Sequence, residues 1–97
     1  MTVTYPVIFT ETNDNKETVL VQIPDIEEGV TEGYGMEDAI FMAKDLLREL
    51  LLEYRADGQD FPEPSEPDDI DVSEGRFADA GESQVMEVTV EVENEQG

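Results

Sequence analysis

The chain has 97 residues, of which 26 are Asp or Glu and 5 are Lys or Arg, so its formal net charge is −21 at pH 7. It contains no His, Cys or Trp. This composition excludes Ser-His and Cys-His nucleophile pairs, zinc sites of the usual Cys/His kind and any disulfide framework. The charge disfavours nucleic acid and anionic membranes as ligands, because both require cationic side chains. It favours a basic partner, metal cations or mimicry of nucleic acid.

The length indicates a single domain over residues 1–97. A chain of about 100 residues buries roughly two-thirds of its unfolded surface, which is enough for one core. The N-terminus has no basic segment followed by a long apolar run, so we expect no signal peptide. Charged residues interrupt the most apolar stretch, residues 40–52, which therefore cannot span a membrane. The sequence predicts a cytoplasmic protein.

The first third of the chain has the pattern of three strands. Residues 2–10 alternate in the way typical of a strand with one core-facing side. Pro6 lacks an N–H, which places this strand at a sheet edge or Pro6 at a point where no ladder bond is required. Turn-forming residues at 12–15 lead to a second strand over residues 18–23, so that the two strands form a hairpin. Residues 30–32 are expected to form a short third strand.

A helix over residues 36–56 is the clearest local prediction. Its apolar residues recur at intervals of three and four, as on the buried stripe of an amphipathic helix. Asp57 and Gly58 end it, and the glycine is available for a left-handed cap.

Residues 57–84 differ in composition from the rest, with ten acidic residues against Arg76 alone. We expect this acidic, Pro-containing segment to be a solvated, partly mobile loop within the domain. Four apolar residues are expected to hold it against the body of the protein: Phe61, Ile70, Val72 and Phe77. Residues 86–93 then alternate as a strand with one solvated face, and residues 95–97 are expected to fray.

In chain order these elements read β-β-β-α-β, which predicts an α+β fold. The first three strands are expected to pair as an antiparallel meander, with one amphipathic helix covering a face of the sheet. The connection from the third strand through the helix to the fourth is long enough for a parallel crossover.

The outer face of the helix carries a candidate contact surface. Phe41 and Leu52 are eleven residues apart and fall together opposite the main apolar stripe, where they flank Asp45 and Arg48. Exposed apolar residues that share a face can mark a partner or self-association surface, although single exposed residues are also ordinary. Both interpretations remain open from the sequence.

Other candidate sites are weak. The acidic cluster at residues 67–71 lacks the ligand spacing of a Ca²⁺ loop and is better explained as a solvated charge run. Gly33, Tyr34 and Gly35 lack the further glycines and the Lys of a phosphate-binding turn, and fit a tight strand-to-helix turn. No pair of carboxylates stands out for acid–base chemistry. The sequence thus predicts no enzyme, no catalytic residue, no metal and no cofactor.

Several short motifs resemble the HicB-like antitoxin family. That family has a "YP" opening strand, a "PDLPGCVTQG" segment, a helix that begins "LEEAL", and "DGxxxPxPS" after the helix. The corresponding segments occur here in the same order: Tyr5–Phe9, Ile23–Ile26, Gly29–Gly33, Met36–Ala39 and Asp57–Ser65. The resemblance covers about two-thirds of the chain, together with the final strand.

The resemblance implies a partial RNase H-like domain that serves as the antitoxin of a type II toxin–antitoxin pair, without nuclease activity of its own. The implied partner is a HicA-like toxin, a small basic mRNA-cleaving ribonuclease whose RNA-binding and catalytic surface the antitoxin occludes. The resemblance also implies a homo-oligomer, with a dimer as the expected form. We expect no DNA-binding module after the last strand, and direct DNA binding is not expected. The alternatives are an acidic DNA mimic or an orphan protein-binding domain without a cognate toxin.

Overall fold

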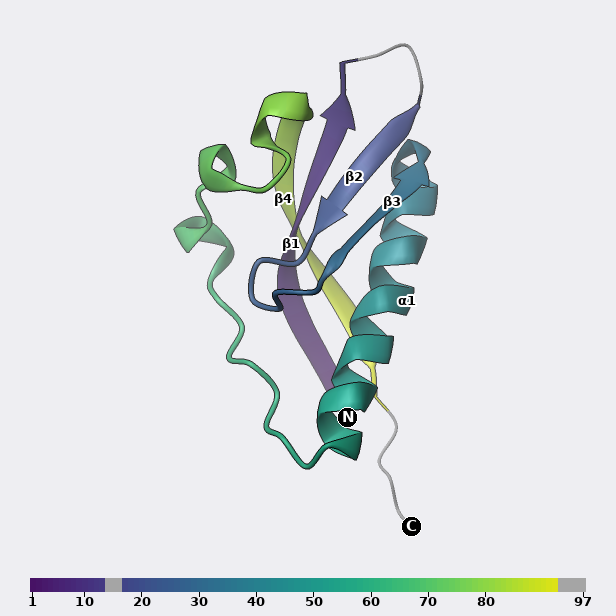
Figure 1. The fold of residues 1–97 in the computed structure, drawn as a ribbon, viewed down its shortest axis with the longest axis vertical. Coiled ribbons are helices and arrows are strands. Elements are labelled where there is room, and N and C mark those ends of the chain that lie inside the picture. Colours follow the sequence, from purple (N-terminus) through teal and green to yellow (C-terminus); the bar gives the residue numbers. More distant parts are fainter. Residues whose placement is uncertain (14–16, 93–97) are drawn as a thin grey trace.

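The computed structural model describes residues 1–13 and 17–92 and contains a four-stranded antiparallel sheet and one long helix (Figure 1). In chain order the main elements are β1 (Thr2–Thr12), β2 (Thr18–Gln22), β3 (Val30–Tyr34), α1 (Gly35–Ala56) and β4 (Gly81–Glu91). The α+β class, the β1–β2–β3 meander and the order β-β-β-α-β are confirmed. The turn predicted at residues 12–15 lies partly outside the described residues, and residues 95–97 lie wholly outside them.

The sheet order is β3-β2-β1-β4, so β1 is central and the placement of Pro6 on an edge strand is wrong. Met1 and Val92 exchange two backbone hydrogen bonds of 2.8 Å, and the pairing from Thr2 to Thr12 continues this register without a bulge. Hydrogen-bonded pairs therefore occur at every second position, and Pro6 opposite Glu87 is not one of them. Its nitrogen faces the side of β2, which pairs with β1 only from Ile8 onward. Pro6 therefore lies at a position where no ladder hydrogen bond is required, which is the second of the two possibilities predicted from the sequence.

Helix α1 packs across one face of the sheet through the predicted apolar stripe. Its fully buried residues are Ala39, Ala43, Leu47 and Leu51, and they join Tyr5, Val7 and Phe9 of β1 in the core. Each buried Leu of this kind contributes about 1.5–3 kcal/mol. Gly33 permits the close contact of β3 with the helix, because a Cβ there would lie 2.6 Å from the backbone nitrogen of Ala39. Gly58, at φ +72°, forms the expected left-handed cap.

The segment between α1 and β4 determines the direction of the last strand. Strand β4 pairs antiparallel with β1, and β3 runs in the same direction as β1, so the predicted possibility of a parallel crossover is wrong. Figure 1 shows the reason: after the helix, the chain returns along the molecule to the opposite end of the sheet before β4 begins. Strand β4 consequently begins at Gly81, five residues before the strand expected from residue 86.

We call the segment from residue 57 to residue 80 the acidic connection. Its later part lies against the sheet face that α1 leaves open, where Ile70 and Gly75 line a shallow pocket with Ile8. The acidic connection contains three short 3₁₀ helices, η1 (Pro67–Asp69), η2 (Val72–Glu74) and η3 (Ala78–Ala80). Its four apolar residues are half-buried, as expected for anchors, and Phe61 packs against the core. On the covered face, Ile8 and Thr10 of β1 are buried. The central strand is therefore enclosed on both sides.

Hydrogen bonds attach the acidic connection to the meander. Ser65 donates from its backbone nitrogen and its hydroxyl to the two carboxylate oxygens of Asp25, at 2.9 and 2.6 Å. Further along, the backbone nitrogen of Arg76 donates to Oε1 of Gln22 at 2.8 Å. Asp25 and Ser65 belong to two of the motifs that carry the family resemblance, so the fold brings those motifs together.

Candidate partner-binding groove

An open groove of about 270 Å³ separates the outer face of α1 from the outer edge of β4. The residues that line it are Phe41, Lys44, Asp45 and Arg48 from α1, and Thr89, Val90 and Glu91 from β4. We call this the α1–β4 groove. It combines an exposed aromatic ring, side chains of both charges and the edge strand of a sheet. Such features suit contact with another polypeptide.

Three of the four residues predicted on the helix face line the α1–β4 groove: Phe41, Asp45 and Arg48. The side chain of Phe41 is 65% exposed. Leu52 is 37% exposed and does not line the groove. Sequence reasoning missed the contribution of β4, because nothing in the local pattern says which strand lies beside the helix.

The edge of β4 presents backbone groups to the groove. Since Val88 and Val90 occupy hydrogen-bonded positions opposite β1, the N–H and C=O groups of Glu87, Thr89 and Glu91 point away from β1. The side chain of Thr89 lies on the face away from α1, where its hydroxyl is 2.7 Å from that of Thr4. Thr89 therefore borders the groove with its backbone.

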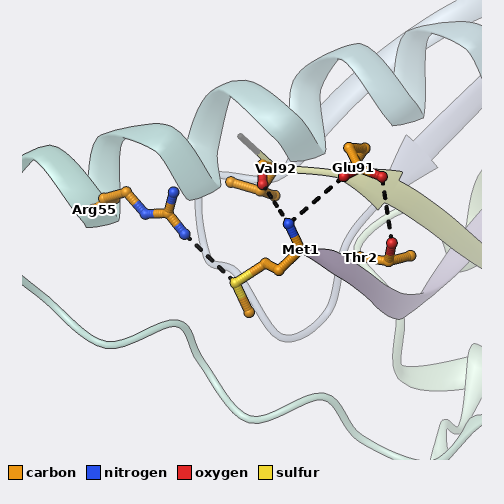
Figure 2. Close-up of polar contacts among 5 residues, drawn as sticks. All are labelled: Met1, Thr2, Arg55, Glu91 and Val92. Carbon is orange, nitrogen blue, oxygen red and sulfur yellow. Dashed lines mark hydrogen bonds and ion pairs between the residues drawn. The ribbon is translucent and has the colours of Figure 1, made fainter. Parts of the chain in front are cut away.

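The carboxylate of Glu91 is held at the end of this edge (Figure 2). Its Oε2 lies 3.6 Å from the amino nitrogen of Met1, and its Oε1 accepts a hydrogen bond from the hydroxyl of Thr2 at 3.4 Å. Arg55, near the end of α1, donates to the sulfur of Met1 at 3.5 Å, and its guanidinium lies 5.6 Å from the ring centre of Phe61. These contacts join one end of the β1–β4 ladder, where β1 begins and β4 ends, to the helix and the acidic connection.

The acidic connection forms a second surface feature, on the opposite side of the sheet from α1. All nine of its acidic residues are exposed. Hydrogen bonds from the hydroxyl and backbone nitrogen of Ser73 lower the pKa of Asp71 below its usual value. Within residues 1–13 and 17–92, no three acidic side chains converge in a way that could hold a metal ion. No helix in the described part of the chain is long and apolar enough to cross a membrane.

The fold and the groove define a small α+β domain with an open groove between its helix and an edge strand. The sequence model of the family described as "HicB_like antitoxin of bacterial toxin-antitoxin system" matches residues 4–73. The chain therefore belongs to the HicB-like antitoxin family.

Solved structures share the fold. A chain of the "Toxin-Antitoxin complex from Streptococcus pneumoniae" is 22% identical with a TM-score of 0.82, over 100% of this chain and 77% of that chain. The "HicA3 and HicB3 toxin-antitoxin complex" includes a chain that is 19% identical, with a TM-score of 0.64, over 95% of this chain and 100% of that one. The N-terminal domain of the Burkholderia pseudomallei antitoxin HicB is 18% identical, with a TM-score of 0.67, over 95% of this chain and 100% of that one. No curated protein matches the sequence.

Proposed function

We propose that this chain is an antitoxin that binds a small, basic, HicA-like mRNA-cleaving toxin and occludes its RNA-binding and catalytic surface. The observation that carries the proposal is the net charge of −21 on a member of an antitoxin family. A ribonuclease surface must be cationic to hold RNA, because neutralising phosphate charges releases counterions and drives binding. An acidic protein that covers such a surface competes directly with RNA.

The distribution of charge supports a role in association rate. The exposed carboxylates of the acidic connection carry nine negative charges against the one positive charge of Arg76. Complementary fields of this kind accelerate encounter with a basic partner and disfavour acidic ones. The proposed site of action is the cytoplasm, where mRNA is cleaved. The expected homo-oligomer, a dimer in its simplest form, belongs to the same proposal and is tested by light scattering on the free chain.

Co-expression tests the proposal. The chain is produced together with any small basic protein that a reading frame beside its gene encodes, and growth, complex formation and RNA cleavage by the purified proteins are measured. We expect a stable complex, rescue of growth and loss of RNA cleavage in the complex. Absence of both complex and rescue would defeat the antitoxin proposal. A complex that still cleaves RNA would contradict occlusion, and displacement of a DNA-binding protein from DNA would favour the acidic DNA mimic instead.

A further inference from the structure

We infer that the outer edge of β4 beside α1 accepts an extended segment of a basic partner, which pairs with β4 as an additional strand of the sheet. The inference rests on the proposed function in one respect: the toxin is the expected source of this strand. The segment that fits this edge is one in which apolar and basic side chains alternate.

The outer edge of β4 has no partner strand in the described part of the chain, since β4 ends the sheet order. The outward N–H and C=O groups of Glu87, Thr89 and Glu91 form a row of donors and acceptors spaced for a further strand. Their side chains are exposed, whereas Ser83 and Val85 at the start of β4 are half-buried beside the acidic connection. The accessible part of the edge is therefore residues 87–91, the part that borders the α1–β4 groove.

The two faces of the sheet beside this edge differ in chemistry, with an aromatic ring on one and carboxylates on the other. An added strand points successive side chains to opposite faces of the sheet. On the face toward α1 they would meet the exposed ring of Phe41, with Asp45 nearby. On the other face they would meet Glu87 and Glu91, whose side chains lie on the solvated side of β4. Alternating apolar and basic residues satisfy both faces at once, as in other cases of strand addition.

The same carboxylates argue against a second copy of this chain as the occupant. Two identical edge strands that meet about a two-fold axis run antiparallel. Pairing centred on Thr89 would place Glu87 of each copy opposite Glu91 of the other, and like charges directly opposite are destabilising. Each copy also brings a net charge of −21. Charged side chains on an edge strand are a common protection against this kind of self-pairing.

A peptide probe tests the edge without the toxin. A synthetic peptide of about eight residues that alternates Lys and Val is titrated into the full chain, and backbone amide exchange is followed by NMR. We expect the amides of Thr89 and Glu91 to exchange at least about tenfold more slowly in the complex. The matched control is the same peptide N-methylated at alternate residues, which keeps the charge and side chains but cannot complete the ladder. Equal binding of the two peptides would overturn the inference.

A pair of variants tests the same edge from the side of the protein. Thr89→Pro removes an outward N–H and leaves the β1–β4 ladder complete, as proline on an edge strand permits. Thr89→Val keeps that N–H and loses only the hydroxyl contact with Thr4. We expect peptide affinity to fall at least about tenfold in the first variant and to change less than about twofold in the second. The peptide control above remains decisive if Thr89→Pro does not fold.

The outcomes separate this inference from the proposed function. If the peptide does not slow the exchange of the Thr89 and Glu91 amides, strand addition is overturned, even if the toxin complex forms. Protection of these amides in the free chain that grows with protein concentration would identify a second copy as the occupant and overturn the basic strand. Protection by the peptide without any toxin complex would support the edge site and defeat the antitoxin proposal.

Discussion

Tyr5 shows how one residue connects three parts of the fold. Its ring is buried in the core beneath α1, and its hydroxyl donates to the carbonyl of Pro62 in the acidic connection. Burial raises the pKa of Tyr5 above its ordinary value, and the nearby Asp25, Tyr54 and Glu63 raise it further. The neutral phenol is therefore the form that the folded protein stabilises.

This raised pKa predicts a stability effect at high pH. The unfolded chain loses the Tyr5 proton near pH 10, whereas the folded chain keeps it to higher pH, so the stabilisation is complete below about pH 10 and is lost as the pH rises further. Tyr5→Phe should cost about 1 kcal/mol at neutral pH through loss of the bond to Pro62. The difference in unfolding free energy between the two proteins should then stay constant up to about pH 10 and shrink as the pH is raised further, as measured by urea unfolding. A difference that stays constant above about pH 10 would contradict the prediction.

At the scale of elements, α1 has two separate roles. Its inner stripe supplies the core, and its outer face borders β4 at the α1–β4 groove. Substitutions on the outer face should therefore change binding with little change in stability, since exposed positions usually alter the unfolding free energy by no more than about 0.5 kcal/mol.

Phe41→Glu tests this separation. Replacing the exposed ring with a carboxylate removes apolar contact area, and we expect the toxin to bind at least about tenfold more weakly while the thermal midpoint stays nearly unchanged. Tyr34→Glu is the matched control, because Tyr34 is an aromatic residue that is 71% exposed at the end of β3 and does not line the groove. Calorimetric titration with the purified toxin measures both variants. Equal affinities for the two would show that Phe41 has no particular part in binding.

At the scale of the whole molecule, the charge acts on folding and on association in opposite directions. The molecule measures 47 × 25 × 18 Å and carries its net charge of −21 on a small surface. Mutual repulsion among carboxylates destabilises the compact state, while the same field attracts a basic partner. The charge therefore lowers stability, and the contribution proposed for it is to association.

Salt separates the two effects. Raising NaCl from about 0.05 M to about 0.5 M shortens the screening length to a few ångströms, so the thermal midpoint of the free chain should rise while the association rate with the toxin falls. Differential scanning calorimetry and stopped-flow mixing measure the two quantities. KCl at the same ionic strengths is the matched control, because screening depends on ionic strength and not on which salt supplies it. An association rate insensitive to salt would show that the charge does not steer the toxin.

How closely each segment follows from the sequence depends on how local its signals are. Helix α1 was predicted almost to the residue, because its apolar spacing and Gly58 are local signals. Three of the four predicted surface residues line the α1–β4 groove for the same reason, since residues on one helix face can be counted from the sequence. The groove residues Thr89 and Glu91 were missed because their position beside the helix depends on strand order. The start of β4 was misplaced because Gly81 and its neighbours carry no clear apolar alternation.

The sequence by itself determined the types of element, their order, the negative charge and the family, because each of these depends on composition or on short-range spacing. Only the tertiary structure decided that β1 is central, that β4 runs antiparallel along its far side and that an edge strand remains beside α1. The direction of β4 follows from the path of the acidic connection. Contacts between residues distant in sequence, such as Ser65 with Asp25 and Arg76 with Gln22, fix that path, and no local pattern encodes them.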